Sequence, residues 1–374
     1  MEAYLDNSAT TKCAAEVVET AVKVMSEDYG NPSSKHMKGV DAEKYIREAK
    51  EVIAKTLKCQ DKEILFTSGG TESNNMAIIG TAMANKRKGM HCIVSSVEHS
   101  SVKEPFNFLE KEGFRITYLP VDKDGIVDIE ALKDALDDET ILVSVMYVNN
   151  EIGAVEPIEE IGHIIKDYNP DIVYHVDAIQ AYGKYKIYPK KLGIDLLSVS
   201  GHKIHGPKGI GFLYIKKGVH IPPFITGGGQ ESGMRSGTEP TPLIMGLMGA
   251  VNELPNAETQ LKKQQELFCF AAEKLSALKG TVINSPQGCL PYILNISLPG
   301  YRSETLLHFL ESRDIFVSSG SACAKGHGSY VLNEMGLDRH IVDSALRISF
   351  SRYNTKEDII LLCEALSDAV KQIR

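Results

Sequence analysis

A lysine in a glycine-rich turn is the residue of this sequence best placed for covalent chemistry. Lys203 lies in the segment SGHKIHGPKG at 200–209, between two strand-like runs at 195–200 and 209–215. A lysine between a strand end and such a turn sits at the edge of a crevice, where partial desolvation lowers its pKa. The free amine can then form a Schiff base with an aldehyde. The alternative is an ordinary solvated surface lysine.

A second segment supplies a carboxylate on a neighbouring strand. The apolar run 172–176 predicts a buried strand that ends at Asp177, with Gln180 three residues further on. A buried carboxylate needs a partner, and the ring nitrogen of pyridoxal phosphate (PLP) is a suitable one. An aspartate at a strand end is otherwise most often a turn former or a helix cap. Asp177 and Lys203 together favour a PLP site.

A third segment has the composition of an anion-binding loop. The sequence EILFTSGGTESNN at 63–75 runs from a short apolar strand through Gly70 and Thr71 into a stretch of helical composition. Glycines let the backbone approach an anion, and the free N–H groups of a first helical turn bind phosphate. The alternative is an ordinary capped loop between a strand and a helix. The patterns GxxxxGK[ST] and GxGxxG are missing from this loop, so nothing in it favours nucleotide binding.

These segments belong to a regular alternation of strand-like and helical runs, recognised by apolar stretches and by 3.6-residue periodicity. The predicted strands are 64–66, 92–95, 115–119, 141–148, 172–176, 196–198 and 211–215. The predicted helices are 14–28, 41–57, 71–88, 102–112, 129–136 and 158–168. Such alternation predicts an α/β fold with a largely parallel sheet covered on both faces. Ligands of such sheets bind beyond the carboxyl ends of the strands, where Thr71, Asp177 and Lys203 fall.

A second, smaller α+β domain is predicted in the last third of the chain. At 374 residues the sequence exceeds one typical core, which favours two domains. A polar helical stretch at 258–279 is followed by strand and helix signals at 293–298, 303–311, 315–317, 346–349 and 358–373. We therefore expect a large PLP-binding domain at 15–255 and a small domain formed by 1–14 together with 256–374.

Composition excludes several classes of function. The net charge of −8 gives no electrostatic footprint for direct nucleic-acid binding. No apolar run reaches membrane-spanning length, and the first residues do not have the pattern of a signal peptide. The seven cysteines are odd in number and scattered without a CxxC pair, which favours reduced thiols in the cytoplasm. Six of them are expected to be buried and inert: Cys13, Cys59, Cys92, Cys269, Cys289 and Cys363.

The seventh, Cys323, has different surroundings. It lies in SSGSACAKGHG at 318–328, a stretch of small residues suited to a mobile loop. A cysteine in such a loop is a candidate nucleophile, and its thiolate is the reactive form. Metal binding by Cys323 with His327 is an alternative, although two ligands do not complete a zinc site.

Together with further motifs, these residues resemble the cysteine desulfurases of the NifS/IscS group, which are class-V aminotransferases among the fold-type I PLP enzymes. The matching motifs extend from residue 4 to about 353 in the order of the family. They are YLDNSATT at 4–11, GGTESNN at 69–75, EH at 98–99, VNNEIG at 148–153, DAIQ at 177–180, the Lys203 segment, GGGQE at 227–231, RSGT at 235–238, SSGSAC at 318–323 and LRIS at 346–349. The resemblance implies a large domain with a mostly parallel seven-stranded sheet and a smaller α+β domain.

The resemblance also implies a role for each matching residue. Lys203 would hold PLP covalently, Asp177 would pair with the ring nitrogen, and His99 would stack on the ring and shuttle protons. Gln180 would hydrogen-bond the phenolic oxygen of the ring, and Asn150 would help to hold the cofactor and the substrate. Arg347 would bind the substrate carboxylate, as its fork-shaped charge suits. Phosphate would be bound by Gly70, Thr71, Ser200 and His202, and by Thr238 of the neighbouring subunit in a homodimer.

The implied reaction converts L-cysteine to L-alanine and leaves the sulfur on Cys323 as a persulfide. An acceptor protein, such as an iron–sulfur scaffold or a tRNA-thiolating enzyme, would then receive it. Only five residues, 324–328, separate Cys323 from the SYVL motif at 329–332, fewer than in family members with long loops, so the identity of the acceptor stays open. The alternatives are another class-V PLP enzyme, such as a selenocysteine lyase or an aminotransferase, and a non-catalytic scaffold with this fold.

Overall fold

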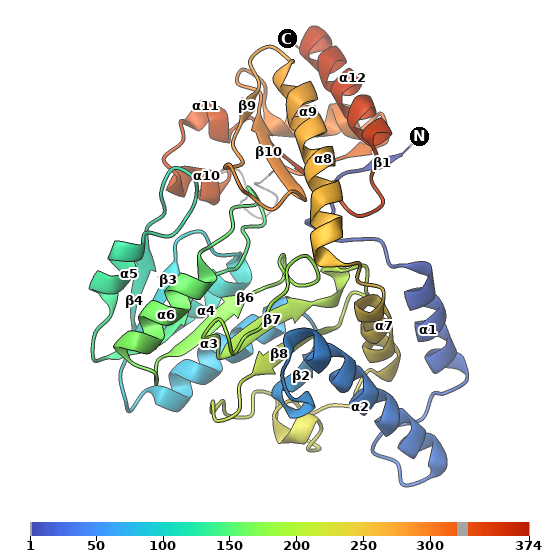
Figure 1. The fold of residues 1–374 in the computed structure, drawn as a ribbon, viewed down its shortest axis with the longest axis vertical. Coiled ribbons are helices and arrows are strands. Elements are labelled where there is room, and N and C mark those ends of the chain that lie inside the picture. The colour runs from blue at the N-terminus through green and yellow to red at the C-terminus, as the bar shows by residue number, and fades with distance from the viewer. Residues whose placement is uncertain (1, 320–327, 374) are drawn as a thin grey trace.

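The centre of the molecule is a seven-stranded sheet, as a computed structural model that describes residues 2–319 and 328–373 shows (Figure 1). Five neighbouring strands are parallel, while β8 runs antiparallel to both of its neighbours. In spatial order the strands are β2 (Ile64–Thr67), β8 (Gly211–Ile215), β7 (Leu196–Ser200), β6 (Val173–Asp177), β5 (Thr140–Ser144), β3 (His91–Ser95) and β4 (Arg115–Leu119). The predicted mostly parallel sheet of an α/β fold is therefore confirmed.

Two hydrophobic cores cover the two faces of this sheet. Along β3, Ile93 belongs to one core while its neighbours Cys92 and Val94 belong to the other, as the two-residue period of a strand requires. Helices α2, α6 and α7 contribute to the first core, and α3 and α4 contribute to the second. The helices before residue 255 are α1 (Ala15–Ser26), α2 (Met37–Leu57), α3 (Gly70–Asn85), α4 (Ser100–Lys111), α5 (Ile129–Ala135), α6 (Ile158–Tyr168) and α7 (Thr241–Asn252).

The C-terminal part of the chain forms a second assembly, drawn above the large sheet in Figure 1. Its three antiparallel strands lie in the order β12-β10-β9, and β11 pairs with β1 in a separate parallel ladder. Its strands are β9 (Val282–Ile283), β10 (Ile293–Ser297), β11 (Ile315–Phe316) and β12 (Ala345–Ser349). Its helices are α8 (Ala257–Ser276), α9 (Ser303–Glu311), α10 (Tyr330–Glu334), α11 (Arg339–Val342) and α12 (Lys356–Gln372).

The first residues of the chain belong to this C-terminal assembly. Strand β1 (Ala3–Tyr4) pairs with β11, and Ala3 and Leu5 are buried in one core with residues of α8, β10 and α12. The division of the chain into 15–255 and 1–14 with 256–374 stays a prediction, and this shared core supports it.

Two local expectations were wrong, and one helix was not predicted. The strand predicted at 141–148 ends at Ser144, because the segment after it turns to line the cavity described below. No helix was predicted at 241–252, yet α7 forms there, apolar on most of its surface and packed against α1 and α2. Its Gly246 lies so close to Pro207 that a Cβ would approach Cγ of that proline to 2.6 Å. Of the six cysteines expected to be buried, Cys92 and Cys289 are buried, Cys13, Cys59 and Cys363 are half-buried, and Cys269 is exposed on α8.

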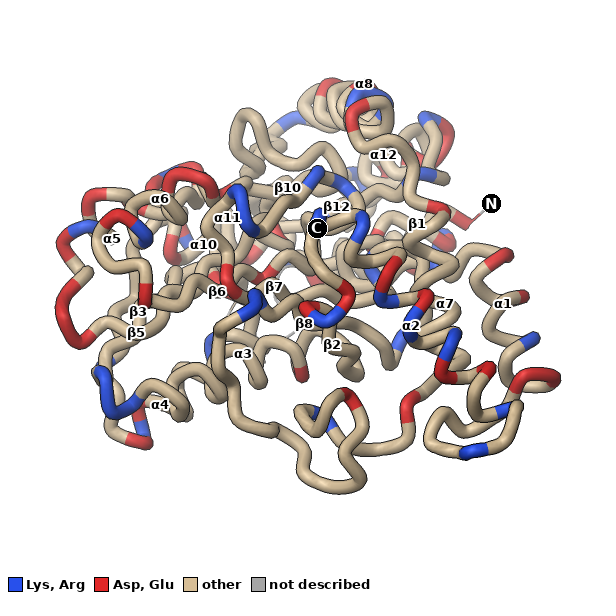
Figure 2. The backbone as a smooth tube through the Cα atoms, turned by 60° about the horizontal axis from the view of Figure 1, so that its bottom comes forward, with Lys and Arg blue, Asp and Glu red and all other residues tan. Residues whose placement is uncertain are grey.

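Charge is unevenly distributed over the surface. Figure 2 shows acidic positions gathered around α5 and α6, while basic and acidic positions are scattered together along the rest of the backbone. None of the helices among the described residues has the length and apolar character needed to cross a membrane.

Candidate active site

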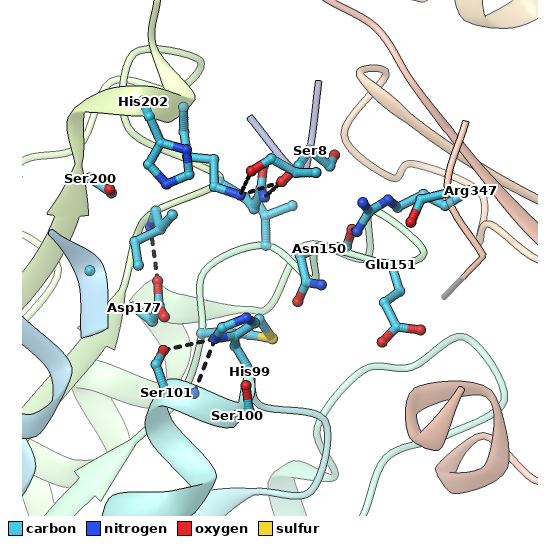
Figure 3. Close-up of a pocket in the computed structure, with 18 of the residues that line it drawn as sticks. Ser8, His99, Ser100, Ser101, Asn150, Glu151, Asp177, Ser200, His202 and Arg347 are labelled. Atoms are coloured by element: carbon cyan, nitrogen blue, oxygen red, sulfur yellow. Dashed lines mark hydrogen bonds between the residues drawn. The ribbon is translucent and has the colours of Figure 1, made fainter. Parts of the chain in front are cut away.

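A cavity of about 410 Å³ lies where the carboxyl ends of the central strands face the C-terminal assembly. Figure 3 shows its polar side chains converging from β6, β7, the start of α4, the 146–151 segment and β12. Of the predicted site residues, ten line this cavity: Gly70, Thr71, His99, Asn150, Asp177, Gln180, Ser200, His202, Lys203 and Arg347. Sequence positions up to 277 apart, from Gly70 to Arg347, are thus brought into one cavity.

Lys203 projects from a short helical turn that follows β7. Its Nζ donates hydrogen bonds to the backbone carbonyls of Ser8 and Ala9, the second over 3.0 Å. Burial, and then the charge of Arg347, lower the pKa of Lys203 to about 8, although Asp6 and Asp177 act in the opposite direction. A lysine with this pKa has far more free amine near neutral pH than an ordinary lysine has, which favours Schiff-base formation.

Asp177 ends β6 at the floor of the cavity and is only 4% exposed. One carboxylate oxygen accepts from the Ile179 backbone N–H and the other from Asn74 Nδ2, each over 2.9 Å. Burial raises the pKa of this carboxyl, while the hydrogen bonds and the charges of His99 and Lys203 lower it. A cation placed against Asp177 would favour its ionised form.

The turn between β2 and α3 forms one end of the cavity. Gly69 has a φ of +147°, a conformation that strains any side chain, and a Cβ on Gly70 would lie 2.1 Å from Cδ1 of Ile179. The backbone conformation therefore favours glycine at 69, and a side chain at 70 would require the end of the Ile179 side chain to move. The 16-residue helix α3 begins at Gly70, so its first N–H groups face an end of the cavity that Ser200 and His202 also line. This is the arrangement that binds a phosphate.

His99 caps the start of α4 on the opposite side of the cavity. Its Nδ1 accepts from the Ser101 backbone N–H over 3.1 Å and lies 2.8 Å from Ser101 Oγ. Burial lowers the pKa of His99, so the neutral ring is favoured. Because Nδ1 is the acceptor, the proton of the neutral ring is on Nε2. The Ser101 hydroxyl also accepts from Asn74, which links His99 to Asp177 through two side chains.

Arg347 lies in β12 and closes the far end of the cavity. Its guanidinium is paired with Asp6 over 2.7 Å and donates to the Asn150 carbonyl over 3.1 Å. Its Nε is buried and has no hydrogen-bond partner among residues 2–319 and 328–373. Oδ1 of Asn150, which also lines the cavity, is likewise buried without a partner in this part of the chain. Both atoms are suited to a ligand that is polar at this end.

One predicted site residue, Thr238, is exposed and does not line the cavity. Cys323 lies outside the described residues, so its predicted role as nucleophile stays a prediction.

Sequence reasoning assigned no role to several residues that the structure brings into the site. Asp6, Ser8 and Ala9 reach it because β1 pairs with β11, 312 residues away in the register of Ala3 with Ile315, and because the residues after β1 lie along β12, where Asp6 bridges to Ser349. Glu151 lines the cavity near Arg347 (Figure 3) and accepts a hydrogen bond from the Ser329 hydroxyl. Burial raises the pKa of Glu151 to about 7, against the effects of Ser329 and Arg347. The motifs YLDNSATT and VNNEIG contain these residues, and they were the available signal.

The polar groups that line the cavity are those that PLP needs. The cavity supplies an amine of lowered pKa, a buried carboxylate for the ring nitrogen, and a helix N-terminus for the phosphate. It also supplies polar atoms without partners at the end where a substrate would lie. No group of three or more metal-ligating side chains occurs in the described part of the chain.

Comparison with known proteins agrees with this geometry. The sequence matches the aminotransferase class-V family over residues 3–362. The chain belongs to this family. It is 44% identical to the cysteine desulfurase IscS of Clostridium botulinum strain Hall, over 100% of this chain and 95% of that protein. It is also 44% identical to the cysteine desulfurase IscS of Methanosarcina thermophila, over 99% of this chain and 92% of that protein.

Solved structures of class-V proteins have the same fold. A NifS-like protein superposes with a TM-score of 0.93 at 38% identity, over 99% of this chain and all of that one. The structure described as SspA in complex with cysteine superposes with a TM-score of 0.84 at 36% identity, over 95% of this chain and all of that one. The predicted membership of the NifS/IscS group and the predicted PLP-enzyme fold are therefore confirmed, and the class-V cysteine desulfurases are PLP-dependent.

Proposed function

We propose that this protein is a PLP-dependent cysteine desulfurase that converts L-cysteine to L-alanine and transfers the sulfur to Cys323 as a persulfide. The proposal rests on the observation that Lys203, Asp177 and Arg347 line the same cavity. An amine, a buried carboxylate and a carboxylate-binding guanidinium are what an amino-acid-processing PLP enzyme needs. The relatives named cysteine desulfurase, aligned over the full chain, make cysteine the substrate we propose.

The cofactor and three side chains have different roles in the proposed reaction. When bound, PLP supplies an electron sink that stabilises negative charge on the α-carbon of the substrate. Arg347 binds the substrate carboxylate through its guanidinium group, whose Nε has no partner among the described residues and whose Nη2 is paired with Asp6 in the free protein. Asp177 keeps the ring nitrogen protonated. Lys203 would hold PLP covalently, and its free amine would accept the α-proton of the substrate.

Sulfur transfer is assigned to Cys323. Its thiolate attacks the sulfur of the substrate, so that a sulfur–sulfur bond forms while the bond from sulfur to the β-carbon breaks. The electron pair of the broken bond remains with the carbon framework, and protons returned by Lys203 and His99 complete L-alanine. The net change is that L-cysteine and the Cys323 thiol become L-alanine and the Cys323 persulfide.

The proposed unit is a homodimer. On α1, the side chains of Val18, Val22 and Met25 are 48%, 55% and 64% exposed and lie on one stripe of the helix. Exposed apolar stripes of this kind mark association surfaces. Thr238 is exposed outside the cavity of its own chain, where it is free to reach the phosphate site of a neighbouring subunit. We further propose that the protein acts in the cytoplasm and delivers sulfur to an iron–sulfur scaffold or a tRNA-thiolating enzyme.

The test compares alanine and sulfide release from L-cysteine and dithiothreitol by PLP-loaded wild type and Cys323→Ala. Cys269→Ala, which changes an exposed cysteine on α8, is the matched control. We expect release by the wild type and by the control, and a persulfide on Cys323 by mass spectrometry. Equal turnover by Cys323→Ala would contradict the proposal and point to a lyase that does not use this cysteine. A higher rate on selenocysteine than on cysteine would identify a selenocysteine lyase instead.

The role of Lys203 is tested separately. Lys203→Ala should lose both activity and the absorbance near ~420 nm that PLP bound to a lysine gives. Full activity without Lys203 would refute the assignment.

A further inference from the structure

A second lysine lies directly behind the cofactor cavity. Lys184 is four residues after Gln180 in a helical turn that follows β6, in which Tyr182 N–H bonds to the Ala178 carbonyl and Tyr185 N–H to the Ala181 carbonyl. Residues four apart lie on the same face of such a turn. The Lys184 Nζ accordingly donates to Oε1 of Gln180 over 3.3 Å.

Lys184 is half-buried, and among the described residues its surroundings contain no anion that would pair with its charge. Within the described ranges, no carboxylate lies within 4.0 Å of its Nζ. Its neighbours are the face of the Tyr292 ring, 5.2 Å from Nζ to the centroid, and a small cavity of about 20 Å³ that Lys203 and His205 also line. Burial, and then the charge of Lys203, lower the pKa of Lys184 to about 7. Desolvation makes the charged form of Lys184 unfavourable here, and the hydrogen bond to Gln180 is its clearest polar contact.

The contacts of Gln180 fix the orientation of its amide from both ends. In its charged form Lys184 has donors only, which favours Oε1 facing it. The Ser8 carbonyl is an acceptor only, so Nε2 must face Ser8, to which it donates over 3.0 Å. Nε2 carries two hydrogens, and the bond to Ser8 uses one of them. The second is left for the cavity, which Gln180 lines.

We propose that Lys184 is a positioning residue of the active site, which holds the Gln180 amide so that an N–H donor faces the cofactor. The proposal rests on the proposed function, because it assigns the donor to the phenolic oxygen of bound PLP. Without Lys184, the Oε1 end of the amide has no donor to hold it, and the side chain can turn away. A donor withdrawn from the phenolic oxygen makes that oxygen more basic, so the protonated, ~420 nm form of bound PLP should persist to higher pH.

The test is a pH titration of the ~420 nm absorbance of PLP-loaded Lys184→Met without cysteine. Met keeps most of the length of the side chain and removes the donor. A hydrogen bond to a charged group contributes about 1.5–3 kcal/mol, so the absorbance midpoint should rise by about 1–2 pH units. Lys186→Met is the matched control, because Lys186 is an exposed lysine two residues away that pairs with Glu258. It should leave the midpoint where the wild type has it.

A double-mutant cycle separates this role from a general effect of charge or stability. In a Gln180→Ala background, Lys184→Met should shift the midpoint by less than about half as much, because the residue through which it acts has gone. An equal shift in both backgrounds, or no shift in either, would overturn the proposal. Lys184→Arg keeps a donor-only cation and should retain the wild-type midpoint, and a shift as large as that of Lys184→Met would count against the orientation argument.

Failure of this inference is distinguishable from failure of the proposed function. A wild type that shows the ~420 nm band and releases alanine supports the desulfurase whatever Lys184→Met does. A wild type without the band would refute the proposed function before the role of Lys184 is reached.

Discussion

Replacing Glu151 by Gln should remove a pH dependence of stability that the structure places in the active site. Glu151 is 4% exposed, and burial raises its pKa from 4.5 to about 7. In the unfolded chain the group ionises near pH 4.5, whereas in the folded protein it keeps its proton until about pH 7. As the pH rises from 4.5 to 7, Glu151 ionises only in the unfolded chain, which lowers the free energy of the unfolded state. The folded protein therefore becomes less stable over this range.

The size of the effect follows from linkage. The raised pKa of Glu151 lowers the free energy of unfolding by about 1 kcal/mol at pH 5 and by about 3 kcal/mol at pH 8. The wild type therefore loses about 2 kcal/mol of stability between these two pH values. With an unfolding entropy of about 2.1 cal/mol/K per residue, this difference is worth roughly 3 °C in the unfolding midpoint of a 374-residue chain. Gln is neutral at both pH values, so Glu151→Gln should gain about 3 °C relative to the wild type on going from pH 5 to pH 8.

The assay is thermal unfolding of the PLP-loaded proteins, followed by circular dichroism at the two pH values. Glu160→Gln, which changes an exposed glutamate on α6, controls for the loss of one negative charge. If the difference between Glu151→Gln and the wild type is the same at pH 5 and pH 8, Glu151 is ionised in the folded protein throughout. The argument from its burial would then be wrong.

Three further predictions concern the active site. Arg347→Lys should raise KM for cysteine about 10–100-fold and keep the ~420 nm band, because a lysine cannot form the bidentate pair; an unchanged KM would show that the carboxylate binds elsewhere. Asp177→Asn should lower kcat about 100-fold or more, as loss of a preorganised charge does, and a kcat within twofold of the wild type would contradict its pairing with the ring nitrogen. If the site is shared between subunits, mixing inactive Lys203→Ala with an inactive Thr238→Asp variant should restore up to about a quarter of wild-type activity, because only mixed dimers have one complete site. No recovery of activity after demonstrated subunit exchange would exclude a shared site.

Much of the fold was predictable because it is encoded locally. The apolar runs that predicted strands at 115–119 and 211–215 and the helix at 158–168 match β4, β8 and α6 residue for residue. Parallel strands place their carboxyl ends at one edge of a sheet, so Asp177 and Lys203 could be assigned to the same crevice from their positions alone. The helix α7 was missed because it is apolar on most sides and so gives no amphipathic period.

The remainder of the site depends on pairing between distant segments, which no local pattern encodes. Asp6 meets Arg347 because β1 pairs with β11 and the segment after β1 lies along β12, where Asp6 bridges to Ser349. Ser8 reaches Lys203 for the same reason. The importance of Lys184 was also hidden, since a lysine after a strand reads as a solvated surface residue until its neighbours are known. Such residues are recognised by what surrounds them in three dimensions.

The participation of the first residues in the site has a consequence for the synthesis of the protein on the ribosome. Asp6 leaves the ribosome 341 residues ahead of its partner Arg347. At a translation rate of about 5–20 residues per second, it waits roughly 20–70 s for that partner. The sheet of the nascent chain can form long before the cavity is closed by β12. Catalytic competence is therefore withheld until Arg347 has been synthesised, and a product released before that point would carry the lysine for PLP without the arginine for its substrate.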